Sequence, residues 1–162
     1  MKTALTIGFF DGVHLGHQAL LRRLRELPHA TILTFSNHPQ GLIRPPAPEL
    51  LISYEERLKQ LREYADQVLV VPFTAEFAQM RFDELLDHFD LSHIILGEGS
   101  VFGKDRGGTM EAVRLYGLER KIAVEYIPKV LFEGAPISSS RIRKALGEGN
   151  TILAEQLLGK RL

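Results

Sequence analysis

Two histidines three residues apart lie in the segment Gly8-Phe9-Phe10-Asp11-Gly12-Val13-His14-Leu15-Gly16-His17, which joins a short apolar run to a helical pattern. Side chains at this spacing share one face of a helix. Here they fall in its first turn, where unpaired backbone amides and the helix dipole favour an anion. Gly16 carries no side chain, so a ligand can approach the backbone closely. The segment therefore predicts a site for a polyphosphate whose negative charge rises during reaction.

A second group of phosphate-binding side chains is predicted near the C-terminus, in Ile137-Ser138-Ser139-Ser140-Arg141-Ile142-Arg143. Consecutive serines at the start of a helix supply hydroxyls and backbone amides. Arg141 and Arg143 can donate paired hydrogen bonds to phosphate oxygens. An ordinary serine-capped helix with solvated arginines has the same sequence, so this segment alone leaves both interpretations open.

Five glycines lie within the twelve residues from Gly97 to Gly108. They permit close approach of a ligand to the backbone, and Lys104 and Arg106 can add positive charge. A surface turn with incidental charges would look the same. Phe35, at a predicted strand end, and Phe102, in the glycine loop, are candidates for stacking on a flat ring.

The overall composition restricts the kind of site to expect. Lysine and arginine together balance aspartate and glutamate at 20 each, which argues against a broad nucleic-acid or membrane surface. Cysteine is absent, so disulfides, thiolate zinc sites and cysteine nucleophiles are excluded. The N-terminal residues have no signal-peptide layout, and no apolar stretch reaches the ~20 residues that span a bilayer. We therefore expect a cytoplasmic protein with a local anion site.

Short apolar runs alternate with helical spacing along the whole chain. Strands are predicted at residues 4–8, 30–35, 68–73, 94–97 and 123–127, and helices at 14–27, 53–64, 74–89 in two pieces, 109–120, 138–146 and 152–158. The proline-rich loop from Ser36 to Ile52 is the candidate for a mobile element over the site. The alternation predicts an α/β fold: an open, mostly parallel five-stranded Rossmann-like sheet with helices on both faces. The three motifs follow the first, fourth and fifth strands, at the carboxyl edge where such sheets bind ligands, so they predict one site.

Taken together, the motifs resemble the FMN adenylyltransferase domain of bacterial bifunctional riboflavin kinase/FAD synthetases, within the nucleotidyltransferase superfamily that carries the His-x-Gly-His motif. The matching pieces are the block from Phe10 to His17, the Phe102-Gly103…Arg106…Gly108 loop and the block from Ile137 to Arg143. Leu157-Leu158-Gly159 also resembles the end of that domain. The order and spacing agree over essentially the whole chain.

The resemblance implies a single adenylyltransferase domain over residues 1–162, without the riboflavin kinase domain of the bifunctional proteins. The implied activity is transfer of AMP from ATP to FMN in the presence of Mg²⁺, giving FAD and pyrophosphate by direct in-line attack. The implied catalytic residues are His14, His17, Ser139 and Arg143. The implied ATP-binding residues are Gly8, Phe9, Phe10, Asp11, Gly16, Gly97, Ser138, Ser140 and Arg141. The implied FMN-binding residues are Phe35, Asn37, His38, Phe102 and Arg106.

Two departures from the family pattern keep alternatives open. The family usually has an aspartate-phenylalanine pair where this chain has Gly99-Ser100, and an acidic residue followed by proline where it has Ser36-Asn37. Both places lie near the expected acceptor end. One alternative is therefore adenylyl or cytidylyl transfer to another phosphomonoester, and another is a nucleotide- or flavin-binding protein that does not turn over. No metal ligands are identified, the expected partners are small molecules, and the oligomeric state is left open.

Overall fold

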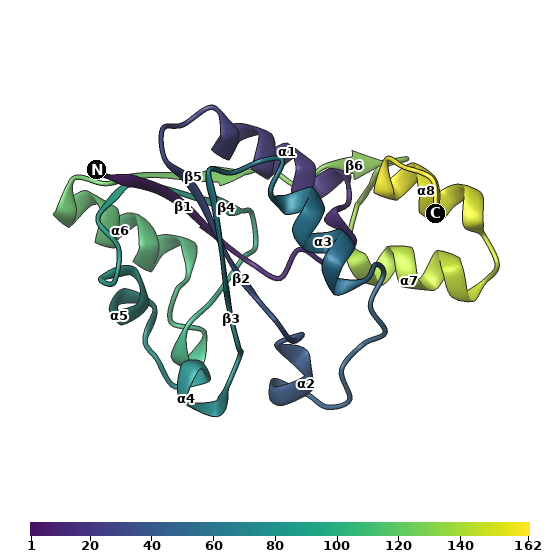
Figure 1. Cartoon of the computed structure of the whole chain (residues 1–162), viewed down its shortest axis with the longest axis horizontal. Helices are drawn as coiled ribbons and strands as arrows, with labels where there is room; N and C mark the ends of the chain where they lie inside the picture. Colours follow the sequence, from purple (N-terminus) through teal and green to yellow (C-terminus); the bar gives the residue numbers. More distant parts are fainter.

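A five-stranded, entirely parallel sheet forms the centre of the protein, as the computed structural model of residues 1–162 shows (Figure 1). The strand order is β3-β2-β1-β4-β5. The strands are β1 (Thr3–Ile7), β2 (Ala30–Phe35), β3 (Gln67–Val71), β4 (Leu91–Gly97) and β5 (Ala123–Ile127). The chain winds outwards from β1 to β3 and then returns to place β4 on the other side of β1. This reversal opens a crevice at the carboxyl ends of β1 and β4, where ligands bind in such sheets.

Helices cover both faces of the sheet because successive strand residues point to opposite sides. On one face, Ala4, Ile32 and Ile95 pack in a core with leucines of α1 (Leu15–Arg25) and α3 (Tyr54–Leu61). On the other face, Leu5, Leu33 and Ile94 pack with α5 (Phe82–Leu86) and α6 (Met110–Arg120). The fold class expected from the sequence is therefore confirmed.

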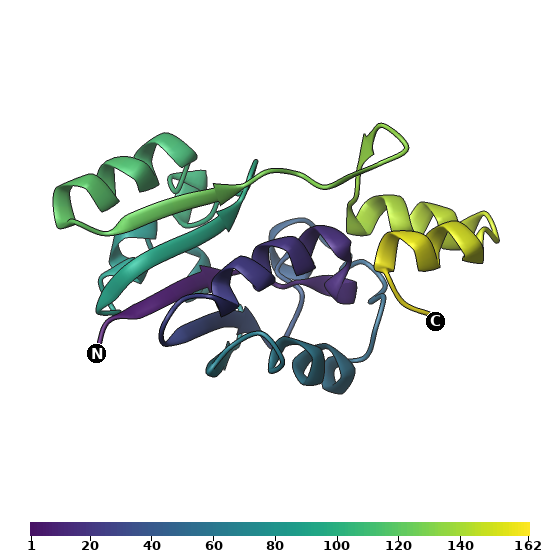
Figure 2. The same cartoon turned by 90° about the horizontal axis from the view of Figure 1, so that it is seen from above.

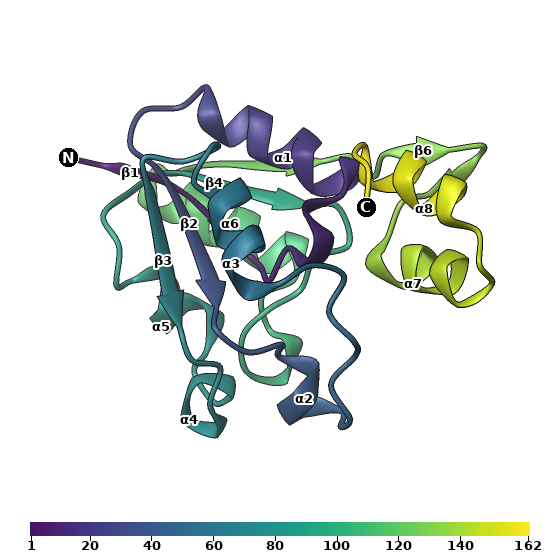
Figure 3. The ribbon, with the colours of Figure 1, turned by 45° about the vertical axis from the view of Figure 1, so that its right-hand side comes forward.

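The C-terminal part of the chain lies beyond the carboxyl edge of the sheet, at the end of the molecule far from the N-terminus (Figure 2). It consists of a hairpin, β6 (Leu131–Phe132) and β7 (Ala135–Pro136), followed by α7 (Ser139–Gly147) and α8 (Thr151–Leu158). The two helices share a small core of their own, with Ile142, Leu157 and Leu158 at its centre. Figure 3 shows α8 next to the start of α1.

Several element boundaries differ from the expectations. The loop from Ser36 to Ile52 contains a short helix, α2 (Gln40–Ile43), and the helix expected to reach residue 64 ends at Leu61. The helix expected at 74–89 is in two pieces, as predicted: α4 (Ala75–Ala78) and α5. The β6–β7 hairpin was not expected. Its turn residues Glu133 and Gly134 both have positive φ, 52° and 78°, which is the geometry of a tight two-residue hairpin turn.

Two further 3₁₀ turns lie in the predicted motifs: η1 (Asp11–Val13) and η2 (Lys104–Arg106). The first helix consequently begins at Leu15, with His14 as its N-cap. No helix of the chain combines the length and apolar character that crossing a bilayer requires.

Candidate active site

The ring of His14 caps helix α1. His14 has extended backbone angles, and its Nδ1 accepts hydrogen bonds from the backbone amides of Gly16 (3.1 Å) and His17 (3.3 Å). The expectation that these first-turn amides are unpaired is therefore wrong, because the histidine side chain already occupies them. Since Nδ1 is an acceptor, the proton of the neutral imidazole lies on Nε2. His14 thus presents Nε2–H as a donor whose direction is fixed by the cap.

Gly16 makes room for the His14 ring. A Cβ at this position would lie 2.9 Å from Cε1 and 3.1 Å from Nδ1 of His14. The sequence interpretation explained the missing side chain by the approach of a ligand, and the structure shows that it also makes room for the His14 ring. Gly8 has a similar role, because a Cβ there would lie 2.9 Å from the Phe10 ring.

A Gly16→Ala variant is expected to lower kcat by about 10- to 100-fold, because the new Cβ would displace the ring of His14, a predicted catalytic residue, and displacements of up to about 1 Å have effects of this size. Stability is expected to change little, since alanine favours a helix over glycine and offsets the weakened cap. Steady-state rates of the purified variant measure kcat, and thermal unfolding measures its stability. Gly147→Ala in α7 is the matched control, because a Cβ there meets nothing within 4 Å. Equal kcat values for the two variants would contradict this interpretation of Gly16.

The two histidine rings are stacked. Their centroids lie 3.6 Å apart with an interplanar angle of 17°, and the Phe10 ring meets His17 edge-on at 5.3 Å. His17 Nδ1 is buried and has no hydrogen-bond partner. Burial, with a smaller contribution from the charge of Lys160, lowers the pKa of His14 to about 4. Burial and the neighbouring His14 hold the pKa of His17 well below its ordinary value. Both rings are therefore neutral at pH 7.

The low pKa of His14 makes stability depend on pH. Below the ordinary pKa of 6.5 the unfolded chain binds a proton at this residue, whereas the folded chain does so only near pH 4. The free energy of unfolding should therefore fall as the pH drops across this interval, by up to about 3 kcal/mol from His14 alone. His14→Asn retains a good N-cap residue and removes the group that titrates. The free energy of unfolding, measured with urea at several pH values, should therefore fall less steeply in this variant as the pH drops. His29→Asn, at an exposed histidine, should behave like the parent chain. If the free energy of unfolding of the His14 variant falls as steeply as that of the parent chain, the pH dependence does not come from His14.

The turn before His14 has a strained backbone. Phe10 and Val13 have positive φ values of 59° and 43°, and a β-branched residue rarely adopts such a conformation. Strain of this kind persists only where surrounding contacts fix the backbone, and it is typical of functional sites. Here the C-terminal segment and α1 supply the contacts. Lys160 Nζ donates to the carbonyl of Gly12 at 2.7 Å. Gln18 Nε2 of α1 donates to the carbonyls of Val13 and Leu158 at 2.9 and 3.0 Å. Lys160 also bonds to Gln60.

The start of α7 meets the same turn. Ser139 Oγ donates to the carbonyl of Asp11 at 3.1 Å, and the guanidinium of Arg143 pairs with the buried Asp11 carboxylate. Arg143 Nε also donates to the carbonyl of Glu49 at 2.9 Å, while Asp11 accepts from the amide of Leu51 at 3.0 Å. The structure therefore brings together the two motifs that lie at opposite ends of the chain. The hydrogen-bonding capacity of the Asp11 carboxylate is therefore used by groups of the protein itself.

The other residues of this motif have separate contacts. Ser138 is the N-cap of α7, and its Oγ accepts from the amide of Arg141 at 3.1 Å. Arg141 itself points to the hairpin, where it donates to the carbonyls of Phe132 and Ala135 at 3.1 and 2.9 Å. Its guanidinium is thus engaged by the hairpin. Ser140 is exposed.

A cavity of about 200 Å³ lies between these motifs, which we name the histidine cavity. Its wall comes from the start of α1, the end of β4, the segment after β5 and the approach to α7. The lining residues are His14, Gly16, Leu20, Gly97, Glu98, residues 127–130, Pro136, Ile137 and Ser138. His17, Ser139 and Arg143 are not part of this wall, and His17 contacts it through the stacked ring of His14.

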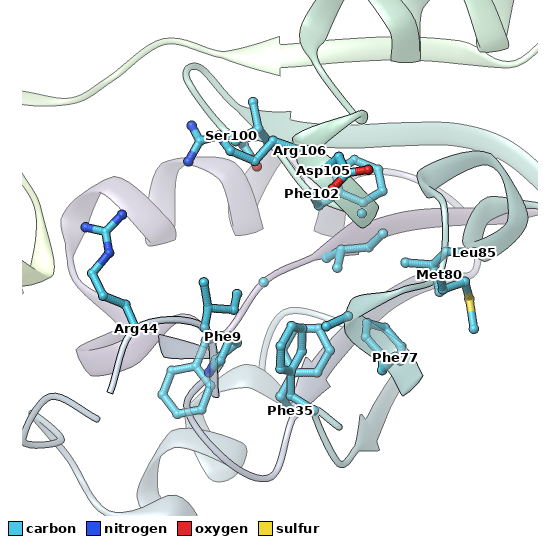
Figure 4. Close-up of a pocket in the computed structure, with 18 residues that line it drawn as sticks. Phe9, Phe35, Arg44, Phe77, Met80, Leu85, Ser100, Phe102, Asp105 and Arg106 are labelled. Atoms are coloured by element: carbon cyan, nitrogen blue, oxygen red, sulfur yellow. The ribbon is translucent and has the colours of Figure 1, made fainter. Parts of the chain in front are cut away.

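A larger cavity of about 510 Å³ lies across the carboxyl ends of β1 and β2, and we name it the aromatic cavity (Figure 4). The predicted acceptor residues Phe35, Phe102 and Arg106 line it. Phe9 and Gly8, which were expected at the nucleotide, line it as well. The sequence interpretation missed much of the apolar wall, including the part that comes from the segment between β3 and the end of α5: Phe73, Phe77, Ala78, Met80 and Leu85.

Two predicted acceptor residues do not line the aromatic cavity. Asn37 bridges the ends of β2 and β3: its amide donates to the carbonyl of Phe73 at 3.0 Å and accepts from the amide of Phe73 at 2.8 Å. His38 packs on the ring of Phe9, with centroids 4.6 Å apart. Each of the two residues therefore contacts a phenylalanine that lines the cavity.

Polar and apolar groups occupy different ends of the aromatic cavity. Figure 4 places Arg44, Ser100 and Arg106 toward one side and Phe77, Met80 and Leu85 toward the other. Arg44 comes from the loop before α3 and was not predicted. The side chains of Arg44 and Arg106 are exposed and form no hydrogen bond or ion pair. Asp105 also lines the cavity and lies next to Arg106 in Figure 4. The two arginines outnumber this one carboxylate, which matches a flat aromatic molecule with an anionic end.

The protein does not provide a preformed metal site. No group of three or more histidine, aspartate or glutamate residues is arranged to hold an ion, and the carboxylates of Asp11 and Glu98 accept backbone hydrogen bonds. This donor set does not fit a dedicated Mg²⁺ cage. Mg²⁺ commonly binds to substrate phosphates and water, with few protein ligands.

Comparisons with known proteins relate this chain to one family. Residues 1–141 match the family model of FAD synthetase. Bifunctional riboflavin kinase/FMN adenylyltransferases from Haemophilus influenzae and Escherichia coli are 34% and 35% identical over 97% and 96% of this chain. The enzyme of the same description from Bacillus subtilis is 31% identical over 98% of the chain. The alignments cover only 55%, 53% and 54% of those proteins, so this chain spans about half of their length.

Two solved structures superpose on this chain. A Streptococcus pneumoniae protein described as a macrolide-efflux protein superposes with a TM-score of 0.82 at 30% identity, covering 98% of this chain and 56% of that one. Pantoate-beta-alanine ligase from Francisella tularensis superposes with a TM-score of 0.56 over 96% of this chain and 78% of its own, and its 13% identity indicates a shared fold alone. On the family-model match and the identity to the bifunctional enzymes, the chain belongs to the FAD synthetase family.

Proposed function

We propose that residues 1–162 form an adenylyltransferase domain that transfers AMP from ATP to FMN. A phosphate oxygen of FMN forms a bond to the α-phosphorus of ATP, and the bond from that phosphorus to the bridging oxygen breaks, so that FAD and pyrophosphate are produced. The observation that carries the proposal is the pair of cavities at the carboxyl ends of the central strands. One is bordered by the histidine turn and the start of α7, and the other has an aromatic wall with arginines at one end.

The aromatic cavity is proposed as the acceptor site. Its volume of about 510 Å³ lies in the range of small-molecule pockets. The flat, aromatic isoalloxazine ring would lie among Phe9, Phe35 and Phe102. The phosphate would lie at the polar end, where Arg44 and Arg106 have no other partner. This orientation directs the phosphate away from the apolar end, as attack on a neighbouring nucleotide requires.

The histidine cavity is proposed as the site of the reacting phosphates of ATP. Neutral His14 donates through Nε2, and its direction is set before the substrate arrives. Catalysis then rests on positioning and on stabilising the charge that develops at phosphorus and on the leaving pyrophosphate. His17 supports the His14 ring, while Ser139 and Arg143 connect α7 to the Asp11 turn. Mg²⁺ would enter with ATP, bound to its phosphates.

Incubation with ATP, Mg²⁺ and FMN tests the proposal. The expected result is loss of FMN fluorescence together with FAD and pyrophosphate identified by mass spectrometry and a coupled assay. Pyrophosphate release with a different phosphomonoester and none with FMN would indicate another acceptor. Tight FMN or ATP binding without pyrophosphate release would identify a binding protein and refute the proposed activity.

A further inference from the structure

Arg57 of α3 is a buried cation without an acidic partner. It is 1% exposed and is among the largest fully buried side chains of the chain. Its guanidinium donates through Nη1 to the carbonyl of Phe9 (2.9 Å) and to Thr34 Oγ1 (2.8 Å), and through Nη2 to the carbonyl of Phe35 (2.7 Å). No carboxylate forms an ion pair with it. Burying a charge in this way is costly, and burial accordingly lowers the pKa of Arg57.

The groups that Arg57 holds are the ends of two strands. Phe9 follows β1 and Phe35 ends β2, and both residues line the aromatic cavity. The guanidinium carbon also lies 3.9 Å from the centroid of the Phe9 ring. Thr34 Oγ1 donates to the same Phe9 carbonyl at 3.3 Å. One guanidinium therefore fixes the backbone of both residues and one of the two rings.

We infer that Arg57 is a positioning residue for the acceptor: its fork of hydrogen bonds sets the separation of the Phe9 and Phe35 walls and thereby the fit of a flavin ring between them. The inference rests on the proposed function of the aromatic cavity. An apolar residue at position 57 could fill the same volume, but it could not bond to the carbonyls of both strands. A lysine has a single ammonium group and cannot reproduce the planar fork.

Arg57→Lys and Arg57→Met test the inference in the full chain. Titration with FMN, followed by fluorescence quenching, should give a dissociation constant raised about tenfold, as loss of a charged hydrogen bond predicts. The dissociation constant for ATP, measured by calorimetry, should stay within about twofold, because the histidine cavity has no contact with Arg57. KM for FMN should rise more than kcat falls. Arg62→Met, an exposed arginine at the C-cap of α3, is the matched control and should bind both ligands normally.

Thr34→Val provides a second test that preserves the shape of the side chain and does not depend on the Arg57 variants folding. It removes the hydroxyl that accepts from Arg57 and should raise the FMN dissociation constant about threefold. FMN affinity unchanged in these variants, or FMN and ATP affinities reduced equally, would overturn the inference while leaving the proposed function intact. Failure of the parent chain to bind FMN would overturn both.

Discussion

Replacing His14 with asparagine is expected to lower kcat for FAD formation by about 100- to 1000-fold, the effect of removing one preorganised donor from a site of developing charge. Asparagine is a favourable N-cap residue, so it can replace the hydrogen bonds that the ring makes to the amides of Gly16 and His17. It cannot replace Nε2–H, the donor that we propose acts on the phosphates of ATP. The substitution therefore separates the structural role of His14 from its chemical role.

Initial rates at saturating ATP and FMN measure the effect, and circular dichroism and thermal unfolding establish that the fold is retained. His29→Asn serves as the control, because that histidine is exposed and lines neither cavity. A His14→Asn enzyme with kcat within a few fold of the parent would exclude Nε2–H as the donor that stabilises the transition state.

Replacing Arg143 with methionine is expected to destabilise the fold by about 3–5 kcal/mol, because it leaves the Asp11 carboxylate buried without its cation. The Asp11 side chain is 3% exposed, and its remaining partner is the amide of Leu51. For a chain of this length such a loss corresponds to a fall in Tm of roughly 10 °C. Activity should be lost as well, since the pair connects α7 to the histidine turn.

The double variant Arg143→Met with Asp11→Asn should be more stable than Arg143→Met alone, because the unpaired buried charge is removed with its partner. Arg120→Met is the control on the surface, where the pair with Asp87 is 41% and 54% exposed and should contribute no more than about 1 kcal/mol. Urea unfolding measures the free energy of unfolding of the parent chain and of the three variants. Equal stability of the Arg143 and Arg120 variants would show that the Asp11 pair does not stabilise the fold.

The sequence by itself determined the fold class and the edge of the sheet at which the site lies. Short continuous apolar runs, such as those that contain Leu5, Ile32 and Ile94, are buried only in a sheet covered on both faces, and burial of apolar surface is the dominant favourable contribution to stability. A capping signal such as Ser53 with Glu56 is equally local: its Oγ accepts from the Glu56 amide at 3.1 Å. Features that depend on residues close together in the chain can therefore be predicted from the sequence.

Only the tertiary structure decided which polar groups face the cavities and which are engaged by the protein. Arg141, Asn37 and Asp11 have the same chemistry as phosphate- or substrate-binding residues, yet their partners are the hairpin, the end of β3 and Arg143. Arg57, in turn, gave no signal within its own helix. The physical reason is that a long polar side chain bonds to whatever group the folded chain places within reach, and here that group often lies tens to more than a hundred residues away.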